Sequence, residues 1–407
     1  MPTIDEQVEI LMSGTEYGDP QTKENMRRDL RARLILAEQQ GRPLRVYCGY
    51  DPRKPDLHLG HTITMYKLRQ FQELGHDVTF LIGSYTSMIG DPSDVDKTRT
   101  QLTLDDVKEN ARTYQEQAFK ILDPARTTVH YNHEWLQLLS FGDVIKLAQN
   151  FTVQQFLTRE NFARRMEAGE AIYLHEMFYA LMQAYDAYHL QADCQVGGQD
   201  QLFNILVAGR KLQQSLGEPP LIAIIMGESL PGTDGEVKMS KSLGNHIPLL
   251  TSPEDMYGKV MSVPDKAMHI YHKLLLSWND RQLKELDAQM QNDPMGTKKN
   301  LAYQIVKTFF GEAGAEQGAH HFATVIQGEG LPDEMPEYAI SEPTKIVDIL
   351  ANAGITSGKG DAKRQIQGGG VRTNGERVDS IEALVNLDEL PVVIKVGKRK
   401  FVRVTPA

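Results

Sequence analysis

Residues 47–61 read YCGYDPRKPDLHLGH, and they join a short apolar run to an amphipathic stretch. Residues 44–46 (LRV) before them read as the start of a buried β-strand. Residues 62–74 after them carry apolar side chains at roughly helical spacing. A strand, a turn rich in Gly and Pro and then a helix form the opening of a βα unit that binds nucleotides in doubly wound sheets.

Two histidines flank a glycine where this predicted helix begins. A helix N-terminus presents unpaired N–H groups and a partial positive charge, so an anionic phosphate can rest there. Gly60 has no Cβ, which lets a base or ribose pack on the backbone. His58 and His61 are three residues apart and could both hydrogen-bond one phosphate chain. Taken alone, the pattern HxGH equally fits a helix start with two surface histidines.

A second motif, KMSKS at residues 238–242, follows a strand-like run at 221–226 and a loop rich in Gly and Pro at 227–236. Phosphoryl or adenylyl transfer needs positive charge where negative charge accumulates, and a mobile loop with two lysines supplies it. The two motifs in this order resemble the HIGH and KMSKS signatures of the class I aminoacyl-tRNA synthetases. The resemblance implies ATP as substrate, Mg²⁺ bound with it, and four catalytic residues: His58, His61, Lys238 and Lys241.

Length and composition are those of an ordinary globular protein of two or three domains, with 407 residues, 41% of them hydrophobic and 24% charged. No apolar run approaches the roughly 20 residues of a membrane span, and the N-terminus does not resemble a targeting segment. Cys48 and Cys194 are the only cysteines, and they make neither a metal-ligand spacing nor a disulfide framework. We therefore expect a cytoplasmic enzyme without a structural metal and without a membrane partner.

Charge is distributed unevenly along the chain. The net charge is −10, but residues 341–407 hold eleven Lys and Arg against eight Asp and Glu, a net of +3 that leaves −13 for the rest. An acidic body with a basic tail predicts that RNA contacts are localised to the tail.

The expected fold class is α/β, with a Rossmann-like parallel sheet, a helical insertion, an all-α domain and a small α+β domain at the C-terminus. The predicted segments are the N-terminal helices with the catalytic domain (1–227, insertion about 136–170), the KMSKS loop with a helical anticodon-side domain (228–330), a linker (331–343) and an RNA-binding domain (344–407). The insertion carries an apolar stripe that either packs on the chain's own core or forms a homodimer interface, and the resemblance favours the interface.

The stretch 172–188 predicts a helix with three polar residues on one face. Tyr179, Gln183 and Asp186 stand at i, i+4 and i+7 among apolar neighbours. Polar groups in so apolar a helix are costly to bury without partners. They either line a polar pocket or bond to other parts of the protein.

These residues resemble the bacterial-type tyrosyl-tRNA synthetase family in particular, over residues from about 46 to the C-terminus. The resemblance implies that Tyr47 and Asp186 hold the phenol hydroxyl of L-tyrosine. It implies further roles for the following residues: Asp91, Tyr179 and Gln183 at the ammonium, Gln201 near the carboxylate, and Asp51, Gly60, Gly198, Asp200, Lys238 and Lys241 at ATP.

The sequence departs from the family pattern at two places. Arg53 stands where the family usually has threonine, and it either adds charge beside the ATP phosphates or points outward. Asp94 and Asp96 precede Lys97 and Arg99 where the family commonly continues with glycine and basic residues, which weakens any assignment of Lys97 and Arg99 to pyrophosphate.

The C-terminal segment resembles a compact RNA-binding fold shared with a ribosomal protein. The resemblance implies a basic RNA-contacting set: Lys359, Lys363, Arg364, Arg372, Lys398 and Arg399. Phosphate contacts of this kind position an RNA without reading its sequence, and a solvated basic surface is the alternative interpretation.

The function expected from these features is two-step attachment of tyrosine to tRNA(Tyr). Three alternatives are a tryptophanyl-tRNA synthetase, an HxGH nucleotidylyltransferase and a non-catalytic RNA-binding paralogue. The pair of Tyr47 and Asp186 suits a phenol better than an indole, a nucleotidylyltransferase would not need the KMSKS loop or basic tail, and a paralogue should have lost signature residues.

Overall fold

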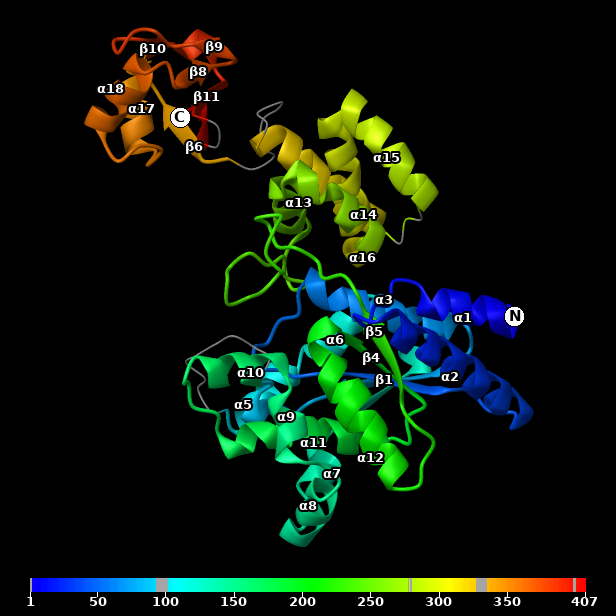
Figure 1. The fold of residues 1–407 in the computed structure, drawn as a ribbon. Helices are drawn as coiled ribbons and strands as arrows, with labels where there is room; N and C mark the ends of the chain where they lie inside the picture. Colours follow the sequence, from blue (N-terminus) through cyan, green and yellow to red (C-terminus); the bar gives the residue numbers. More distant parts are fainter. Residues whose placement is uncertain (1, 93–101, 277, 279, 327–334, 398–399) are drawn as a thin grey trace. The chain divides into compact units, whose positions relative to one another are not determined.

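The computed structural model describes residues 2–92, 102–276, 278, 280–326, 335–397 and 400–407 (Figure 1). The chain divides into two compact units. One contains Met1–Thr251 and Ser262–Leu301, and the other contains Ser252–Met261 and Ala302–Ala407. The domain boundaries expected from the sequence remain a prediction.

A five-stranded parallel sheet forms the centre of the first unit, in the order β3-β2-β1-β4-β5. Its strands are β1 (Arg45–Tyr50), β2 (Asp77–Ile82), β3 (Thr127–Tyr131), β4 (Cys194–Gly198) and β5 (Ile222–Met226). The strand order reverses between β1 and β4, and ligands of doubly wound sheets bind beyond the carboxyl ends of the strands at this point. The predicted Rossmann-like sheet is confirmed.

Helices cover this sheet because its strands are apolar on both faces. All five residues of β5, IAIIM, are buried, as is typical of a parallel strand covered on both sides. Helix α3 (Leu59–Glu73) packs on β1, β2 and β4, and α2 (Pro20–Gln39) packs on β5. Asp19 starts α2 by accepting hydrogen bonds from two backbone N–H groups of its first turn.

The segment after α1 (Ile4–Met12) ties the sheet edge to α3. The N–H of Glu16 donates to the carbonyl of Ile225 in β5 over 2.9 Å. Lys67 of α3 is buried and donates to the carbonyls of Ile10 and Ser13, at 3.2 and 3.0 Å. The end of β5, where the loop to KMSKS begins, is thereby connected to the helix that starts at HLGH.

Short helices fill the rest of the first unit. The bounds are α4 (Thr86–Ile89), α5 (Leu104–Ala111), α6 (Tyr114–Ala118), α7 (His133–Leu136), α8 (Phe141–Ala148), α9 (Val153–Leu157), α10 (Glu160–Glu167), α11 (Leu174–His189), α12 (Arg210–Ser215), α14 (Met268–Leu275) and α15 (Asp280–Asn292). The segment predicted as an insertion, about 136–170, contains α8, α9 and α10. Figure 1 shows α5, α9 and α10 on the opposite side of the view from α1 and α2.

The second unit contains most of α13 (Pro253–Ser262) and the part of α16 (Pro294–His321) from Ala302 onward. Helix α16 kinks at Gly311, where φ is 73°. Its C-terminal sheet has the order β6-β12-β11-β8-β9. The bounds are β6 (Glu337–Ile340), β7 (Thr344–Lys345), α17 (Ile346–Asn352), α18 (Lys359–Gln367), β8 (Val371–Thr373), β9 (Glu376–Arg377), β10 (Leu384–Val385), β11 (Val392–Val396) and β12 (Lys400–Pro406). Asn374 and Gly375 form the predicted tight turn, both with positive φ.

One strand of this unit was not visible in the sequence pattern. The linker predicted at 331–343 contains strand β6, which pairs in parallel with β12. Ile340 is buried in the C-terminal core, but four residues between prolines and acids are too few to show a strand pattern in the sequence. Residues 327–334 lie outside the described part of the chain.

Candidate functional site

The first part of the site is the start of α3, where His58 caps the helix. The Nδ1 atom of His58 accepts the N–H of Gly60 over 3.2 Å, and the Nδ1 atom of His61 accepts the N–H of His58 over 3.1 Å. The two ring centres are 3.9 Å apart. Because each Nδ1 accepts a hydrogen bond, each Nε2 carries the proton and can donate to an anion.

Both histidines are neutral near pH 7. Burial, with His61 next in effect, lowers the pKa of His58 far below its ordinary value. Burial, with Lys238 next in effect, lowers the pKa of His61 to about 4. The pair therefore offers two N–H donors and no charge, and the positive charge must come from the loop.

The KMSKS loop lies over the first turn of α3. The N–H of Leu59 donates to the carbonyl of Ile247 over 3.0 Å. A Cβ built on Gly60 would stand 3.6 Å from the Cβ of Met239, which is buried. Gly60 therefore lies directly beneath the motif, and the two signatures form one site.

Both loop lysines are paired with acids at this site. The Nζ atom of Lys238 lies 3.1 Å from Oδ1 of Asp200, and Lys241 pairs with Asp56. Burial acts to raise the pKa of Asp200, but Lys238 and the amide of Gln201 outweigh it and hold that pKa below its ordinary value. Gly198 adjoins this carboxylate, since a Cβ there would stand 2.8 Å from Oδ1 of Asp200.

Asp186 on α11, the predicted acceptor of the phenol hydroxyl, is buried and already hydrogen-bonded. Its Oδ1 accepts the indole N–H of Trp135 at 2.7 Å, and its Oδ2 accepts an amide N–H of Asn132 at 3.0 Å. Burial raises the pKa of Asp186 to about 8, although both hydrogen bonds act in the opposite direction. The Asp186 carboxyl is 2% exposed, so it can accept a hydroxyl without competition from water.

Tyr47 on β1 lies close to Asp186, as expected from the sequence. Its pKa is raised well above the ordinary value, first by burial and next by the charge of Asp186. Its hydroxyl donates to the carbonyl of Gln183 over 3.4 Å. The structure thus places Tyr47 and Asp186 together without a direct hydrogen bond between them.

A chain of hydrogen bonds leads from Asp186 towards α3. Asn132 donates to Thr86 over 3.1 Å, and Thr86 donates to Oδ1 of Asp51 over 2.7 Å. Tyr179 donates to Oδ2 of Asp51 over 3.1 Å. Asp51, which the sequence analysis assigned to ATP, therefore also contacts a predicted tyrosine-site residue. A Cβ on Gly83 would collide with this carboxylate at 1.9 Å.

A second group of bonds surrounds Asp91. Its Oδ2 accepts from Gln201 at 2.6 Å and its Oδ1 from Arg159 at 2.5 Å. Asn204 donates to both Gln201 and Gln183 over 3.0 Å. All six residues predicted for tyrosine are therefore linked by hydrogen bonds or by the proximity of Tyr47 to Asp186.

Four functional candidates were missed by sequence reasoning: Asn132, Trp135, Arg159 and Asn204. Each completes the hydrogen bonding of a predicted site residue. Thr86 lies in the run 84–93, which the sequence marks as a ligand position at the end of a strand. A positional signal was available for Asn132, which directly follows β3 at the carboxyl edge of the sheet, and Trp135 lies three residues further on in α7. Arg53, whose direction the sequence left open, donates to the carbonyl of Ser87 over 3.1 Å. Residues 94–99 lie outside the described part of the chain.

The predicted RNA-contacting residues of the second unit are exposed, where the structure describes them. Lys359, Lys363 and Arg364 lie on α18, and Arg372 lies on β8. Lys359 pairs with Asp348 at 2.8 Å and Arg364 with Asp361 at 3.5 Å, so part of this charge is neutralised locally. Lys398 and Arg399 lie outside the described residues.

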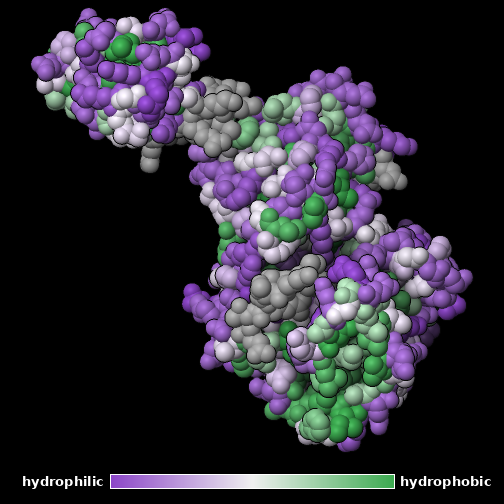
Figure 2. Space-filling model, turned by 60° about the vertical axis from the view of Figure 1, so that its left-hand side comes forward, coloured by the Kyte–Doolittle hydropathy of each residue, from purple (hydrophilic) through white to green (hydrophobic). Residues whose placement is uncertain are grey.

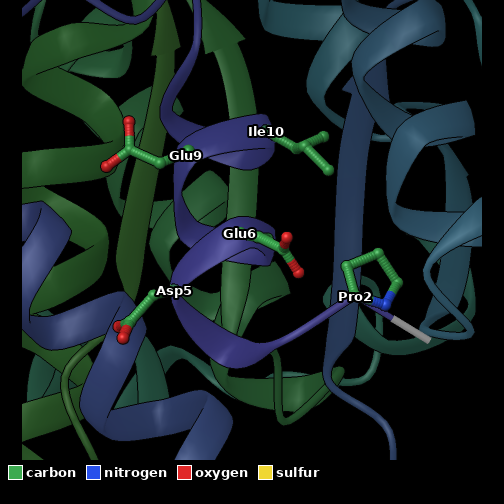
Figure 3. Close-up of a pocket in the computed structure, with 5 residues that line it drawn as sticks. All are labelled: Pro2, Asp5, Glu6, Glu9 and Ile10. Atoms are coloured by element: carbon green, nitrogen blue, oxygen red, sulfur yellow. The ribbon is translucent and has the colours of Figure 1, made fainter.

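Other surface features do not form a site. A shallow hollow of about 560 Å³ lies along α1. Two of its lining acids are already paired, Asp5 with Arg31 and Glu9 with Arg27. Figure 3 shows Asp5 and Glu9 on one side of α1 and Glu6 and Ile10 on the other. Among the residues described, no cluster of three or more His, Cys, Asp or Glu side chains could hold a metal ion. None of the described helices is long and apolar enough to cross a membrane.

The doubly wound sheet, the paired histidines and the lysine loop above them define a class I tRNA synthetase. The family described as "tRNA synthetases class I (W and Y)" matches residues 39–327, and a "Tyrosine--tRNA ligase SYY-like C-terminal domain" matches residues 327–404. The chain belongs to this family.

Within the family the similarity is to the tyrosine enzymes, and the chain is a member of the tyrosine–tRNA ligases. Tyrosine–tRNA ligase of Thermotoga maritima is 47% identical, covering 89% of this chain and 90% of that protein. The Carboxydothermus hydrogenoformans ligase is 42% identical over 98% of this chain and 97% of its own. A mitochondrial tyrosyl-tRNA synthetase of Aspergillus nidulans, at 23% identity and TM-score 0.61, covers 80% of this chain and 94% of its own and shows the same fold.

The first prediction concerns the neutral histidines. Replacement of His61 by Ala should slow ATP-dependent adenylate formation by about 10²–10³-fold because a donor to the phosphate is lost. His61→Gln should keep more activity, since its amide N–H can take the place of Nε2–H. The wild-type rate should not decline between pH 5.5 and 7.5, because the imidazole with pKa about 4 is already neutral. A decline centred near pH 6.5 would contradict this account.

The second prediction concerns Asp186. A carboxyl whose pKa is 3.8 when unfolded and about 8 when folded retains a proton in the folded state that the unfolded chain releases. Its stabilising contribution is therefore complete below pH 4 and is lost as the pH rises through 8. Asp186→Asn cannot titrate, so its Tm relative to that of the wild type should rise between pH 5 and pH 8.5. A Tm difference that is constant over this range would contradict the raised pKa.

Proposed function

We propose that this chain activates L-tyrosine with ATP to tyrosyl-adenylate and then transfers the tyrosyl group to the terminal adenosine of tRNA(Tyr). The observation that carries the proposal is a pair of hydrogen-bonded groups, one from Asp186 to Tyr179 and one from Asp91 to Gln183. Tyr47 lies between them, since it bonds to Gln183 and lies close to Asp186, and Gln201 connects the second group to Asp200 beside the lysine loop. Together the two groups offer an acceptor for a phenol at one end and an acceptor for an ammonium near the phosphate site.

The first step requires positioning more than acid–base chemistry. The carboxylate of tyrosine, ionised at neutral pH, attacks the α-phosphorus of ATP in line; the new O–P bond forms as the bond to the bridging oxygen breaks and pyrophosphate leaves. No side chain needs to remove a proton, so orientation and charge stabilisation dominate. His58 and His61 donate their Nε2–H groups to the phosphate oxygens.

The lysines supply the charge that the histidines lack. Lys238 and Lys241 exchange Asp200 and Asp56 for the oxygens of the departing pyrophosphate. Such an exchange is feasible because Lys238 is 60% exposed and its pair with Asp200 is one hydrogen bond. Mg²⁺ bound with the ATP phosphates would share the same negative charge.

Selection of tyrosine rests on the buried carboxyl of Asp186. A substrate that lacks the hydroxyl would not supply the hydrogen bond that this buried group is placed to accept, and a site built for a hydroxyl rejects such a substrate strongly. Tyr47 borders the same position. Asp91, Tyr179, Gln183 and Gln201 orient the amino-acid end.

The other parts of the chain would hold the tRNA. We assign residues 228–330 to the anticodon side of the tRNA and residues 344–407 to a second RNA contact, through Lys363, Arg372 and the neighbouring basic residues. A cytoplasmic location fits this substrate.

We also propose a homodimer formed through the helical insertion. The stripe expected from the sequence divides in two: Leu147 and Phe156 pack in a core cluster with α11, whereas Phe141 and Ile145 are 79% and 53% exposed. Figure 2 shows hydrophobic residues gathered at the lower end of the molecule, at the height of α8 in Figure 1. Large exposed apolar patches mark interaction sites.

If the homodimer forms through the insertion, a charged side chain placed in the interface should prevent dimerisation. Phe141→Asp should convert the sedimenting species from dimer to monomer, because the carboxylate would lose water on association. Leu387→Asp, at a site 45% exposed in the C-terminal unit, serves as the control and should remain dimeric. A wild-type monomer, or a Phe141→Asp dimer, would contradict the proposed interface.

ATP–pyrophosphate exchange with each of the twenty amino acids tests the proposed activity. Exchange with tyrosine alone is the expected result. Exchange with another amino acid would retain the class and refute the assignment of Tyr47 and Asp186. If no amino acid supports exchange, the proposed activity is wrong.

A further inference from the structure

Arg159 is a buried cation at the edge of the proposed tyrosine site. Its side chain is 5% exposed and its Nη2 atom lies 2.5 Å from Oδ1 of Asp91, which is 8% exposed. Arg159 is the N-cap residue of α10, so it comes from the helical insertion and not from the sheet. Sequence reasoning gave it no role.

Helix α10 also contacts Pro92, the residue that follows Asp91. Asn161 donates to the carbonyl of Pro92 over 2.7 Å, one residue beyond Asp91. The other Asp91 oxygen, Oδ2, accepts from Gln201 at 2.6 Å. Asp91 is thus oriented from two directions, by α10 on one oxygen and by the residues after β4 on the other.

Helix α10 is itself attached to the helix that carries the pocket. Arg165 forms a two-pronged pair with Glu176 of α11, at 2.5 and 2.9 Å. Phe162 is fully buried, and the guanidinium groups of Arg159 and Arg165 each lie 5.8 Å from its ring centre. Helix α10, which begins at Arg159, is therefore attached to α11, the helix that carries Tyr179, Gln183 and Asp186.

The buried carboxylate of Asp91 is held by donors on both of its oxygens. Arg159 contacts Oδ1 and Gln201 contacts Oδ2. A buried carboxylate is costly unless a cation is paired with it, and Arg159 supplies that cation without covering both oxygens.

We propose that Arg159 is a positioning residue for amino-acid recognition: it holds Asp91 as the oriented anion that receives the ammonium group of the substrate. The inference rests on the proposed function, in which that substrate is tyrosine. It also means that the helical insertion completes the amino-acid site.

The test compares two ligands that differ only in the ammonium group. L-Tyrosine and 3-(4-hydroxyphenyl)propanoate are titrated calorimetrically into the full-length wild type, Arg159→Gln and Asp91→Asn, and the KM values for tyrosine and ATP are measured in pyrophosphate exchange. Arg159→Gln should raise the Kd and KM for tyrosine by about tenfold or more. The Kd of the propanoate and the KM for ATP should change by less than about twofold, since neither ligand uses Asp91.

Arg165→Gln is the matched control. It removes an arginine from the same helix, the same Phe162 ring and a similar ion pair, but it does not contact Asp91. It should affect both ligands to the same small extent. Arg159→Lys, which keeps the charge, should recover part of the tyrosine affinity and provides a second variant if Arg159→Gln is poorly folded.

The double variant Arg159→Gln/Asp91→Asn shows whether Arg159 acts through Asp91 or independently of it. It should bind tyrosine no more weakly than Asp91→Asn alone, because residues that act as a unit are not additive. Equal losses for both ligands in Arg159→Gln, or full additivity, would overturn the inference while the proposed function stands. A wild type that does not bind tyrosine would overturn both.

Discussion

Buried polar atoms need hydrogen-bond partners, and this requirement governs the first unit of the structure. The parallel sheet and its helices bring three carboxyl groups, Asp51, Asp91 and Asp186, into its interior. Each is satisfied by a neutral or positive donor from another element, among them Trp135, Thr86 and Arg159. In the proposed function, a substrate with a hydroxyl at one end and an ammonium at the other would bring a donor to Asp186 and another to Asp91.

The phosphate side of the site follows a different rule. Its histidines are neutral, so they act as donors, while charge is carried by the two lysines of a loop that lies over α3. In this structure Asp200 and Asp56 hold those lysines. Catalysis of this kind depends on where the loop is placed, and the hydrogen bond from Leu59 to Ile247 fixes that placement at one point.

Much of this fold could be predicted from the sequence, because its signals are local. HLGH and KMSKS are contiguous motifs, and the turn at Asn374 needs only two residues. The polar face of α11 was visible from spacing. Strand β6 was not, because pairing with β12 decides it and four residues carry too little pattern. The roles of the individual site residues remain predictions.

The partners of the site residues could not be predicted for a related reason. Asn132 and Trp135 reach Asp186 across more than fifty positions, and Arg159 reaches Asp91 across 68. Single polar residues at such separations leave no periodicity in one sequence. Only the folded chain shows which residues contact the predicted acids. Asn132 and Trp135, which follow β3, bond to Asp186, and Arg159 of the helical insertion bonds to Asp91.

A structure of the chain with bound L-tyrosine tests the central claim most directly. The account predicts the phenol oxygen within hydrogen-bond distance of Asp186 and the ammonium nitrogen within hydrogen-bond distance of Asp91, with Arg159 still paired to that carboxylate. Tyrosine bound in the reverse orientation, or outside this network, would contradict it.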